Sequence, residues 1–282
     1  MKTKKYKCGV ILLTGFPNAG KSTLLNCILK KKISIISHKV QTTKEKISGI
    51  LNLNNSQLIF TDTPGILENR KYKTKSLSRS IQDEEKNIDI NLFIHDLTKN
   101  LDKRFLNEIS SIIQHFKKNY LVLNKIDLVS KDKMLRYSEF LNSEINFSKT
   151  FMISAKKRKG LEYLINNLIS EIPERNWKYN KKITVTKGIN YRISEITREK
   201  IFDFTNKEIP YSVKIKTKIK NEEKIVRIFQ EIFVNKDSQK SIIIGKNAEK
   251  IKMIGTRSRI DIEKILKKKV FLDLIVKKMR IK

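Results

Sequence analysis

Four short polar segments each follow an apolar run of strand length. In chain order they are Gly15-Phe16-Pro17-Asn18-Ala19-Gly20-Lys21-Ser22, Asp62-Thr63-Pro64-Gly65, Asn124-Lys125-Ile126-Asp127 and Ser154-Ala155-Lys156. The apolar runs are typical of strands buried on both faces of a parallel sheet. Helical spacing of apolar residues lies between them, at 22–29, 104–116, 133–145 and 161–172. This alternation predicts a doubly wound α/β sheet, in which ligands bind at the carboxyl ends of the strands.

The first segment has the residues of a phosphate-binding loop. Gly15 and Gly20 allow a tight backbone whose N–H groups point at phosphate oxygens, and the following helix adds the positive end of its dipole. We expect Lys21 to reach the β- and γ-phosphates and Ser22 to coordinate Mg²⁺. The other residues expected along the nucleotide here are Phe16, Pro17, Asn18, Ala19 and Thr23. The alternative is a glycine turn that only caps a helix, and the Gly-Lys-Ser ending disfavours it.

The second segment is expected to sense the γ-phosphate. Asp62 ends a strand and should hold Mg²⁺ through a water, and the Gly65 N–H should meet the γ-phosphate of GTP, which GDP lacks. The segment that follows would therefore be a switch. Thr42 or Thr43 should complete the Mg²⁺ shell; Thr43 is favoured, and a surface turn is the alternative. The remaining residues expected at this part of the nucleotide are Thr63, Pro64 and Ile66.

The third and fourth segments are expected to select guanine. The Asp127 carboxylate can accept hydrogen bonds from N1–H and the exocyclic amino group, a donor pair that adenine lacks. The Ala155 N–H can donate to guanine O6. The rest of these two segments, expected at the base, is Asn124, Lys125, Ile126, Ser154 and Lys156. The four segments together predict an enzyme that hydrolyses GTP to GDP and phosphate.

The residue after Gly65 predicts slow hydrolysis. Related GTPases often carry Gln there to orient the attacking water, whereas this chain has Ile66. We expect Lys21, Thr43 and Gly65 to act on the reacting phosphate, and the Asn18 amide oxygen to help hold a K⁺ between phosphates.

A second, smaller unit follows the nucleotide-binding region. Pro173 closes the predicted helix at 161–172, and the polar, lysine-rich residues 174–190 are interpreted as a linker. We therefore predict a nucleotide domain at 1–173 and a second domain at 191–282. The order in the second domain is helix, strand, strand, helix, helix, strand, at 194–204, 211–218, 224–234, 237–244, 248–267 and 270–276.

By these motifs the chain resembles the Era family of GTPases over nearly its whole length. Gln41-Thr42-Thr43 and Asp62-Thr63-Pro64-Gly65-Ile66 are similar to that family's forms, as are Ser194-Glu195-Ile196-Thr197-Arg198-Glu199-Lys200 and Pro210-Tyr211-Ser212 in the second unit. The resemblance implies an α+β type II KH domain whose Gly-x-x-Gly loop clamps single-stranded RNA. It also implies binding to the 3′ end region of small-subunit ribosomal RNA and a role in assembling that subunit.

The chain departs from the family pattern at three places. The Gly-x-x-Gly loop is Gly245-Lys246-Asn247-Ala248, so an Ala replaces the second Gly. The region around Asn180-Lys181-Lys182 lacks the family's Pro and acidic residues, and the chain stops at Lys282, where relatives often carry a further tail. These departures bear on RNA binding and on coupling between the domains.

The charge is strongly basic, at +32 from 61 basic and 29 acidic residues. Such a balance favours nucleic acid or an anionic membrane as partner. A coding bias is the alternative explanation, because lysines number 49 and arginines only 12. The basic residues expected to meet RNA at the loop and the next helix are Lys246, Lys250, Lys252, Arg257 and Arg259. A solvated helix face is the alternative there.

The remaining residues indicate little special chemistry. Cys8 and Cys27 are interpreted as core thiols of a reducing compartment. His38, His95 and His115 lack metal-site spacing, and Trp177 is expected to stack on a base or to pin the linker, with pinning favoured. The N-terminus lacks signal-peptide features, and no run approaches the ~20 apolar residues of a membrane span. We expect a cytoplasmic protein, with peripheral membrane contact left open.

Two other functions fit parts of the sequence. A tRNA-modifying GTPase would share Asn18, but it should carry a long helical domain and a C-terminal cysteine, whereas the last cysteine is Cys27. An RNA-binding scaffold with a decayed GTPase is disfavoured by the intact Lys21, Asp62 and Asp127.

Overall fold

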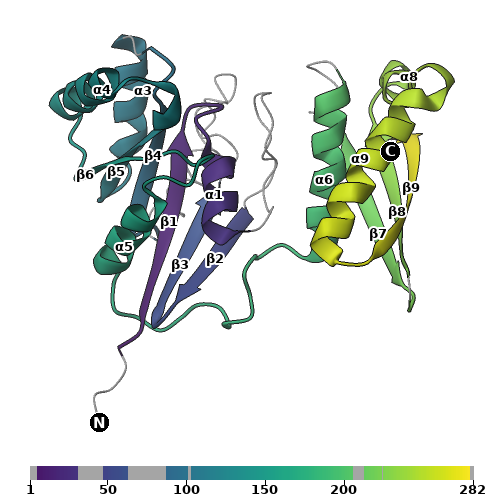
Figure 1. The fold of residues 1–282 in the computed structure, drawn as a ribbon, viewed down its shortest axis with the longest axis horizontal. Helices are drawn as coiled ribbons and strands as arrows, with labels where there is room; N and C mark the ends of the chain where they lie inside the picture. The colour runs from purple at the N-terminus through teal and green to yellow at the C-terminus, as the bar shows by residue number, and fades with distance from the viewer. Residues whose placement is uncertain are drawn as a thin grey trace. The chain divides into compact units, whose positions relative to one another are not determined.

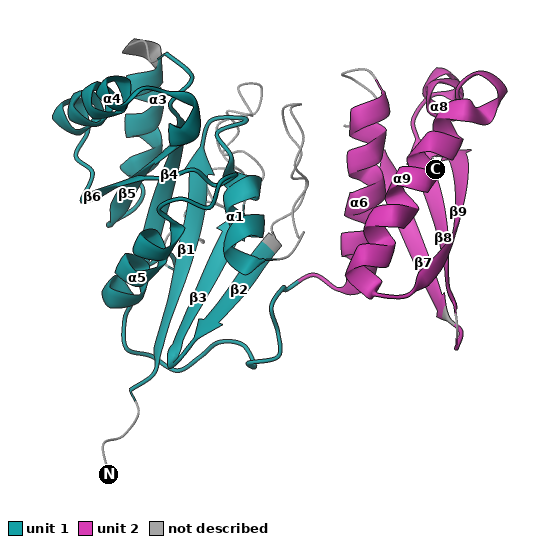
Figure 2. Cartoon of the chain, viewed as in Figure 1, with its two compact units in different colours: residues 1–33, 43–186 teal, residues 34–42, 187–282 magenta. Residues whose placement is uncertain are grey.

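The chain folds into two compact units, each with its own sheet and core. The computed structural model describes residues 5–30, 47–62, 87–100, 103–205, 213–223 and 225–279. The described residues of the first unit run from 5 to 186, and those of the second from 187 to 279 (Figure 2).

The first unit contains a six-stranded sheet in the order β2-β3-β1-β4-β5-β6 (Figure 1). Neighbouring strands are parallel except for the antiparallel pair β2 and β3. β3, β4 and β5 are buried along their whole lengths, as their apolar runs predict. The doubly wound α/β class predicted from the sequence is confirmed. The strands are β1 (Lys7–Gly15), β2 (Ile47–Leu53), β3 (Ser56–Asp62), β4 (Ile90–Asp96), β5 (Asn119–Asn124) and β6 (Lys149–Met152).

Helices cover both faces of this sheet. The described helices are α1 (Lys21–Leu29), α3 (Lys103–Ile113), α4 (Lys131–Glu144) and α5 (Leu161–Glu171). Alternate residues of β5 separate the two faces, since side chains along a strand point to opposite sides. Leu121 and Leu123 join a core with α3 and α4, while Tyr120 contacts Phe151, which in turn contacts Tyr163 of α5.

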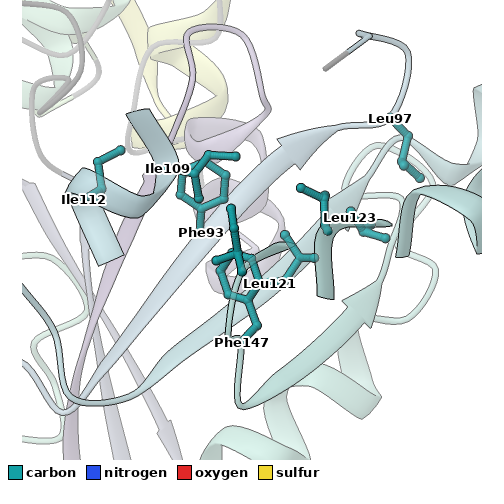
Figure 3. Close-up of a cluster of buried hydrophobic side chains, with 9 residues drawn as sticks. Phe93, Leu97, Ile109, Ile112, Leu121, Leu123 and Phe147 are labelled. Carbon is teal, nitrogen blue, oxygen red and sulfur yellow. The ribbon is translucent and has the colours of Figure 1, made fainter. Parts of the chain in front are cut away.

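The core under α3 and α4 lies close to the first polar segment. Figure 3 shows Phe93 of β4 and Phe147 among its buried side chains, and their ring centroids lie 6.2 Å apart. Phe16 packs against this core, with its ring centroid 4.9 Å from that of Phe105 and 5.8 Å from that of Phe93. The phosphate loop is therefore anchored by an aromatic contact at its start.

Residues 174–186, expected in the linker, lie along the first unit's sheet. The Trp177 indole N–H donates to the Asn55 carbonyl at 3.1 Å, and its ring meets that of Tyr6 edge-on. Thr186 N–H donates to the Ser48 carbonyl at 3.0 Å. The prediction that Trp177 pins this segment is confirmed.

The second unit has a three-stranded sheet in the order β7-β8-β9, with β7 antiparallel and β9 parallel to β8. α6 and α9 contact each other and pack on one face of this sheet (Figure 1). The element order is the predicted one, and its parts are α6 (Ile189–Phe204), β7 (Lys214–Asn221), β8 (Ile225–Val234), α8 (Asp237–Ile244), α9 (Glu249–Leu266) and β9 (Lys269–Lys278). The α6 helix begins five residues earlier than its predicted start at Ser194.

The core between α6 and the sheet includes polar side chains with partners. Thr197 of α6 donates to the Gln230 carboxamide oxygen at 2.6 Å, and the Gln230 NH₂ group donates to Thr217 at 2.9 Å. Ser194 and Thr217 share a hydrogen bond of 2.6 Å. These bonds show which residues of β7 and β8 face the helices. Among the helices of the described ranges, none combines the length and apolar character that crossing a membrane requires.

Candidate nucleotide site and candidate RNA-binding loop

The loop between β1 and α1 has the backbone that its sequence predicts. Gly15, Asn18 and Gly20 have φ values of 134°, 63° and 98°. A side chain at Gly20 would place its Cβ 2.2 Å from the Asn124 amide nitrogen, so glycine is required here by both space and backbone. The Gly20 carbonyl accepts the first helical hydrogen bond, from Leu24 N–H at 2.8 Å. The N–H groups of the first turn of α1 are therefore placed at the loop, as anion binding needs.

Lys21 and Ser22 begin α1 at this loop. The Lys21 ammonium group donates to the Gly15 and Phe16 carbonyls at 2.8 and 3.0 Å, and so lies across the loop. The Ser22 hydroxyl donates to the Asp62 carboxylate at 3.1 Å. A hydroxyl and a carboxylate side by side are the oxygen ligands that Mg²⁺ prefers, so these residues fit the predicted metal.

Asn124 joins the phosphate loop to the fourth polar segment. Its side-chain NH₂ group donates to the Ala19 carbonyl at 2.8 Å, and its amide oxygen accepts from Ala155 N–H at 3.0 Å. Asn124 is 2% exposed, so both bonds are shielded from water. Three segments far apart in the sequence are thus held together at the carboxyl ends of their strands.

The structure adds Asp96 and Thr98 to the residues expected at this site. The Lys125 ammonium group donates to the Asp96 carboxylate at 2.5 Å, and Asp96 also accepts from Thr98 N–H and hydroxyl at 3.0 and 2.7 Å. Burial acts to raise the pKa of Asp96, but the hydrogen bonds from Lys125 and Thr98 outweigh it and lower that pKa. The only sequence signal was the position of Asp96 at the end of an apolar strand.

Asp127 and Ser154 belong to the two segments that are expected at the base. A hydrogen bond with Ser154 lowers the pKa of Asp127, with smaller contributions from Lys157 and Lys156. Ser154 is fully buried, and its hydroxyl accepts from Lys157 N–H at 3.0 Å. Asp127 is therefore ionised and partly open to solvent, as an acceptor for two base donors must be.

Several expected site residues lie outside the described residues: Thr42, Thr43, Thr63, Pro64, Gly65 and Ile66, together with Gln41 of the family-like motif. His38 and Pro210-Tyr211-Ser212 lie outside them as well. The histidine that can be placed in the core is His95, which is 2% exposed and stacked on Tyr137 with ring centroids 6.1 Å apart.

The loop between α8 and α9 has an unusual backbone. Gly245 has φ 75° and ψ 172°, and Asn247 and Ala248 follow with φ values of 51° and 60°. The helix was predicted to begin at Ala248, but Ala248 has the left-handed conformation and α9 begins at Glu249. Left-handed backbone favours glycine, so the alanine in this loop carries strain.

The basic residues near this loop divide between two sides of α9. Residues seven apart share a helix face, so Lys250 lies in line with Arg257, and Lys252 with Arg259. Rotation by about 100° per residue puts these two pairs on nearly opposite sides. Lys250 lies against the loop, because a Cβ on Gly245 would come 2.7 Å from the Lys250 Cβ. These four basic residues are therefore close in sequence but do not form a single cluster on the helix.

Two protein-family models match the chain. Residues 10–125 match a family described as 50S ribosome-binding GTPase, and residues 208–280 match the KH domain.

Curated relatives match over nearly the full length. GTPase Era of Ehrlichia canis is 39% identical, over 96% of this chain and 92% of the relative. GTPase Era of Agrobacterium fabrum is 38% identical, over 96% of this chain and 86% of the relative.

Two solved structures match 97% of the chain with a TM-score of 0.86. One is Era in complex with MgGDPNP and nucleotides 1506–1542 of 16S ribosomal RNA, at 33% identity over 97% of this chain and 94% of that one. Another is an Aquifex aeolicus Era variant bound to GDP and AlF4⁻, with the same identity and coverage.

Proposed function

Because the chain belongs to the Era family of GTPases, we propose that it couples GTP hydrolysis to binding of small-subunit ribosomal RNA and assists assembly of that subunit. The observation that best supports GTP binding is the pair of Asn124 hydrogen bonds, which hold the phosphate loop against the segment expected at the base. The RNA half is supported by the matching KH domain and by the 16S RNA fragment in the Era complex.

The described residues are assigned the following roles at the nucleotide. The loop from Gly15 to Lys21 surrounds the phosphates, with Lys21 turning from its loop carbonyls to the β- and γ-phosphates. Asp127 accepts from the guanine N1–H and amino groups, and Ala155 N–H donates to O6. Asp96 keeps the Lys125 ammonium group at the edge of this site, so that the lysine side chain does not move across it.

The metal assignment uses Ser22, Asp62 and Thr43. The Ser22 hydroxyl and the Asp62 carboxylate already lie 3.1 Å apart. Of the two similar solved structures, one contains MgGDPNP and the other GDP with AlF4⁻. When bound, Mg²⁺ neutralises charge on the phosphates. Thr43 is retained in this set from the sequence alone.

Hydrolysis by the isolated chain is proposed to be slow. Ile66 offers no group to orient water, so Gly65 N–H, Thr43 and Lys21 are left to stabilise the transferred phosphoryl group. Asn18 is exposed at φ 63° in the loop, where its amide oxygen can hold K⁺ against the phosphates. Equal turnover in KCl and NaCl would remove the role of K⁺.

RNA is proposed to bind at Gly245–Ala248. Lys246 lies in this loop, Lys250 and Arg257 lie on the side of α9 nearer to it, and Lys252 and Arg259 are given a lesser role. One family description names the 50S subunit. The small subunit is the better supported target, because the 50S match covers only the GTPase part, whereas the Era–16S complex aligns over 97% of the chain.

The test measures GTP turnover and RNA binding on the same preparations. Lys21→Ala should abolish turnover and leave anisotropy binding of a 16S 3′-end RNA fragment intact. Lys246→Gln combined with Lys250→Gln should weaken binding of that RNA and leave GTP turnover in the absence of RNA unchanged. Turnover that survives Lys21→Ala would refute the phosphate assignment, and RNA binding indifferent to both lysines would refute the loop assignment.

The domain boundaries and the location also stand as proposals. We propose a GTP-binding domain at 1–173, a connecting segment at 174–190 and a KH domain at 191–282, although residues 174–186 contact the first unit. We propose a cytoplasmic location, with the basic surface able to touch an anionic membrane. Sedimentation with vesicles that contain anionic lipid, against neutral vesicles, tests that contact.

A further inference from the structure

The sheet of the second unit has one face turned away from α6 and α9. Side chains alternate along its strands, and Thr217 and Gln230 lie on the helix side, as their bonds to α6 show. Their neighbours in sequence therefore point to the opposite side. Within the described residues, no helix packs across this opposite face, which we call the outer face (Figure 1).

A row of lysines follows β7 on the outer face. Lys214, Lys216, Lys218 and Lys220 occupy alternate positions and are all exposed. The antiparallel register places Lys218 opposite Phe229 on β8. Lysines are often placed on an edge strand simply because they prevent it from pairing with another strand, so the row by itself does not indicate a ligand.

Exposed aromatic side chains lie beside the lysine row. Phe229 is 40% exposed, Phe271 50% and Ile275 48%. The parallel register pairs Phe229 with Asp273, which stands between Phe271 and Ile275 on β9. The Arg227 guanidinium lies 5.5 Å from the centre of the Phe271 ring. These side chains therefore form one continuous patch rather than scattered exposed residues.

The charge of the outer face is strongly positive. Its acidic residues are Glu231, Asp273 and Glu222, which follows β7; Glu231 accepts a hydrogen bond from Lys277, and Glu222 accepts one from Arg227 at 3.1 Å. The register sets Lys216 opposite Glu231, and Lys277, followed by Lys218 and Lys216, lowers the pKa of Glu231. The basic residues on the face are Lys214, Lys216, Lys218, Lys220, Arg227, Lys269 and Lys277.

We propose that the outer face is a second RNA-binding surface, on which bases of a single strand stack on Phe229 and Phe271 while Lys216 and Lys218 contact its phosphates. Flat aromatic groups beside cations are what a sheet needs to bind single-stranded RNA. A protein partner fits less well, because charged residues are depleted at the cores of protein interfaces, whereas nucleic-acid interfaces are strongly positive. The surface is made of β7, β8 and β9, and so differs from the loop between α8 and α9.

A tryptophan reporter tests the stacking directly. Phe271→Trp in the full chain, with the parent as blank for Trp177, should show fluorescence quenching when a short mixed-sequence single-stranded RNA is added. Inorganic polyphosphate should not quench it, because it has charge but no bases. The same RNA carrying a fluorescent label reports total binding by anisotropy.

Paired glutamine variants test the phosphate contacts. Lys216→Gln with Lys218→Gln should weaken RNA binding several-fold and lower the slope of log K against log salt by about 1.4, or about 0.7 per single-strand phosphate contact. Lys131→Gln with Lys178→Gln, at exposed positions of the first unit, is the matched control and should change neither. Hydrogen exchange of amides in α9 and β9 should be equally slow in all variants, which shows that the second unit is folded in each.

The outcomes separate this proposal from binding at the α8–α9 loop. If anisotropy showed RNA binding without tryptophan quenching, and if the two glutamine double variants bound RNA equally well, the outer-face proposal would be refuted and the proposed binding at the α8–α9 loop would stand. A tryptophan response to RNA-free small-subunit protein, and none to RNA, would likewise overturn it, in favour of a protein partner.

Discussion

The strain at Ala248 gives a prediction whose size follows from one backbone angle. Ala248 has φ 60° and ψ 19°, a conformation that costs a residue with a Cβ about 1–2 kcal/mol. Glycine avoids this cost but loses about 0.4–1 kcal/mol through the greater freedom of the unfolded chain. Ala248→Gly should therefore stabilise the second unit by about 0.5–1 kcal/mol, equivalent to about 3–6 °C in Tm for a domain of this size.

Hydrogen exchange of amides in α9 and β9 measures this change within the full chain, because amides that exchange through unfolding report the unit's own free energy. Glu249→Gly is the matched control: Glu249 has φ −63° and ψ −42°, so glycine there should destabilise by up to ~1 kcal/mol. Asn247→Gly, at φ 51°, should gain less than Ala248→Gly, since Asn tolerates this region better than Ala. Destabilisation by Ala248→Gly equal to that of Glu249→Gly would refute the strain argument.

Three further predictions concern the first unit. Asp127→Asn should lower the affinity for GTP at least 100-fold and allow binding of xanthosine triphosphate, whose 2-oxo group accepts a hydrogen bond from the new amide. Competition binding measures both affinities, and an unchanged GTP affinity would contradict the base assignment. Asp96→Asn should lower the affinities for GTP and GDP alike by about 10-fold, because Lys125 loses its ionic partner. A fall in kcat with unchanged nucleotide affinity would argue against this positioning role. Burial lowers the pKa of His95 to about 4, so as the pH falls the unfolded chain binds the proton before the folded chain does. The free energy of unfolding of this unit should therefore fall by about 3 kcal/mol between pH 6.5 and pH 4. If the urea midpoint of His95→Phe still followed the parent's pH dependence, this assignment would be contradicted.

The sequence predicted the strands well because a buried parallel strand needs a continuous apolar run, and β3, β4 and β5 have one. The start of α6 was missed for a similar reason. Its first turn mixes apolar and polar residues, Ile189-Asn190-Tyr191-Arg192, and Gly188 before it provides no side-chain cap, so neither periodicity nor a capping side chain marked the boundary.

The contacts within the site were beyond sequence patterns. Asn124 and Ala19 are separated by 105 residues, and only the assembled sheet brings them together. The Lys125–Asp96 pair likewise depends on β4 and β5 being neighbours. At Ala248, helix propensity favoured a helical residue, but the chain must turn there after Gly245, and the local geometry prevailed.

The two hydrogen bonds of the Asn124 side chain have a kinetic consequence. One side-chain amide bonds both the loop around the phosphates and the loop beside the base, so opening either loop alone costs one of these shielded bonds. Departure of a bound nucleotide should then occur as a single exponential, without a half-released species detectable by stopped-flow fluorescence.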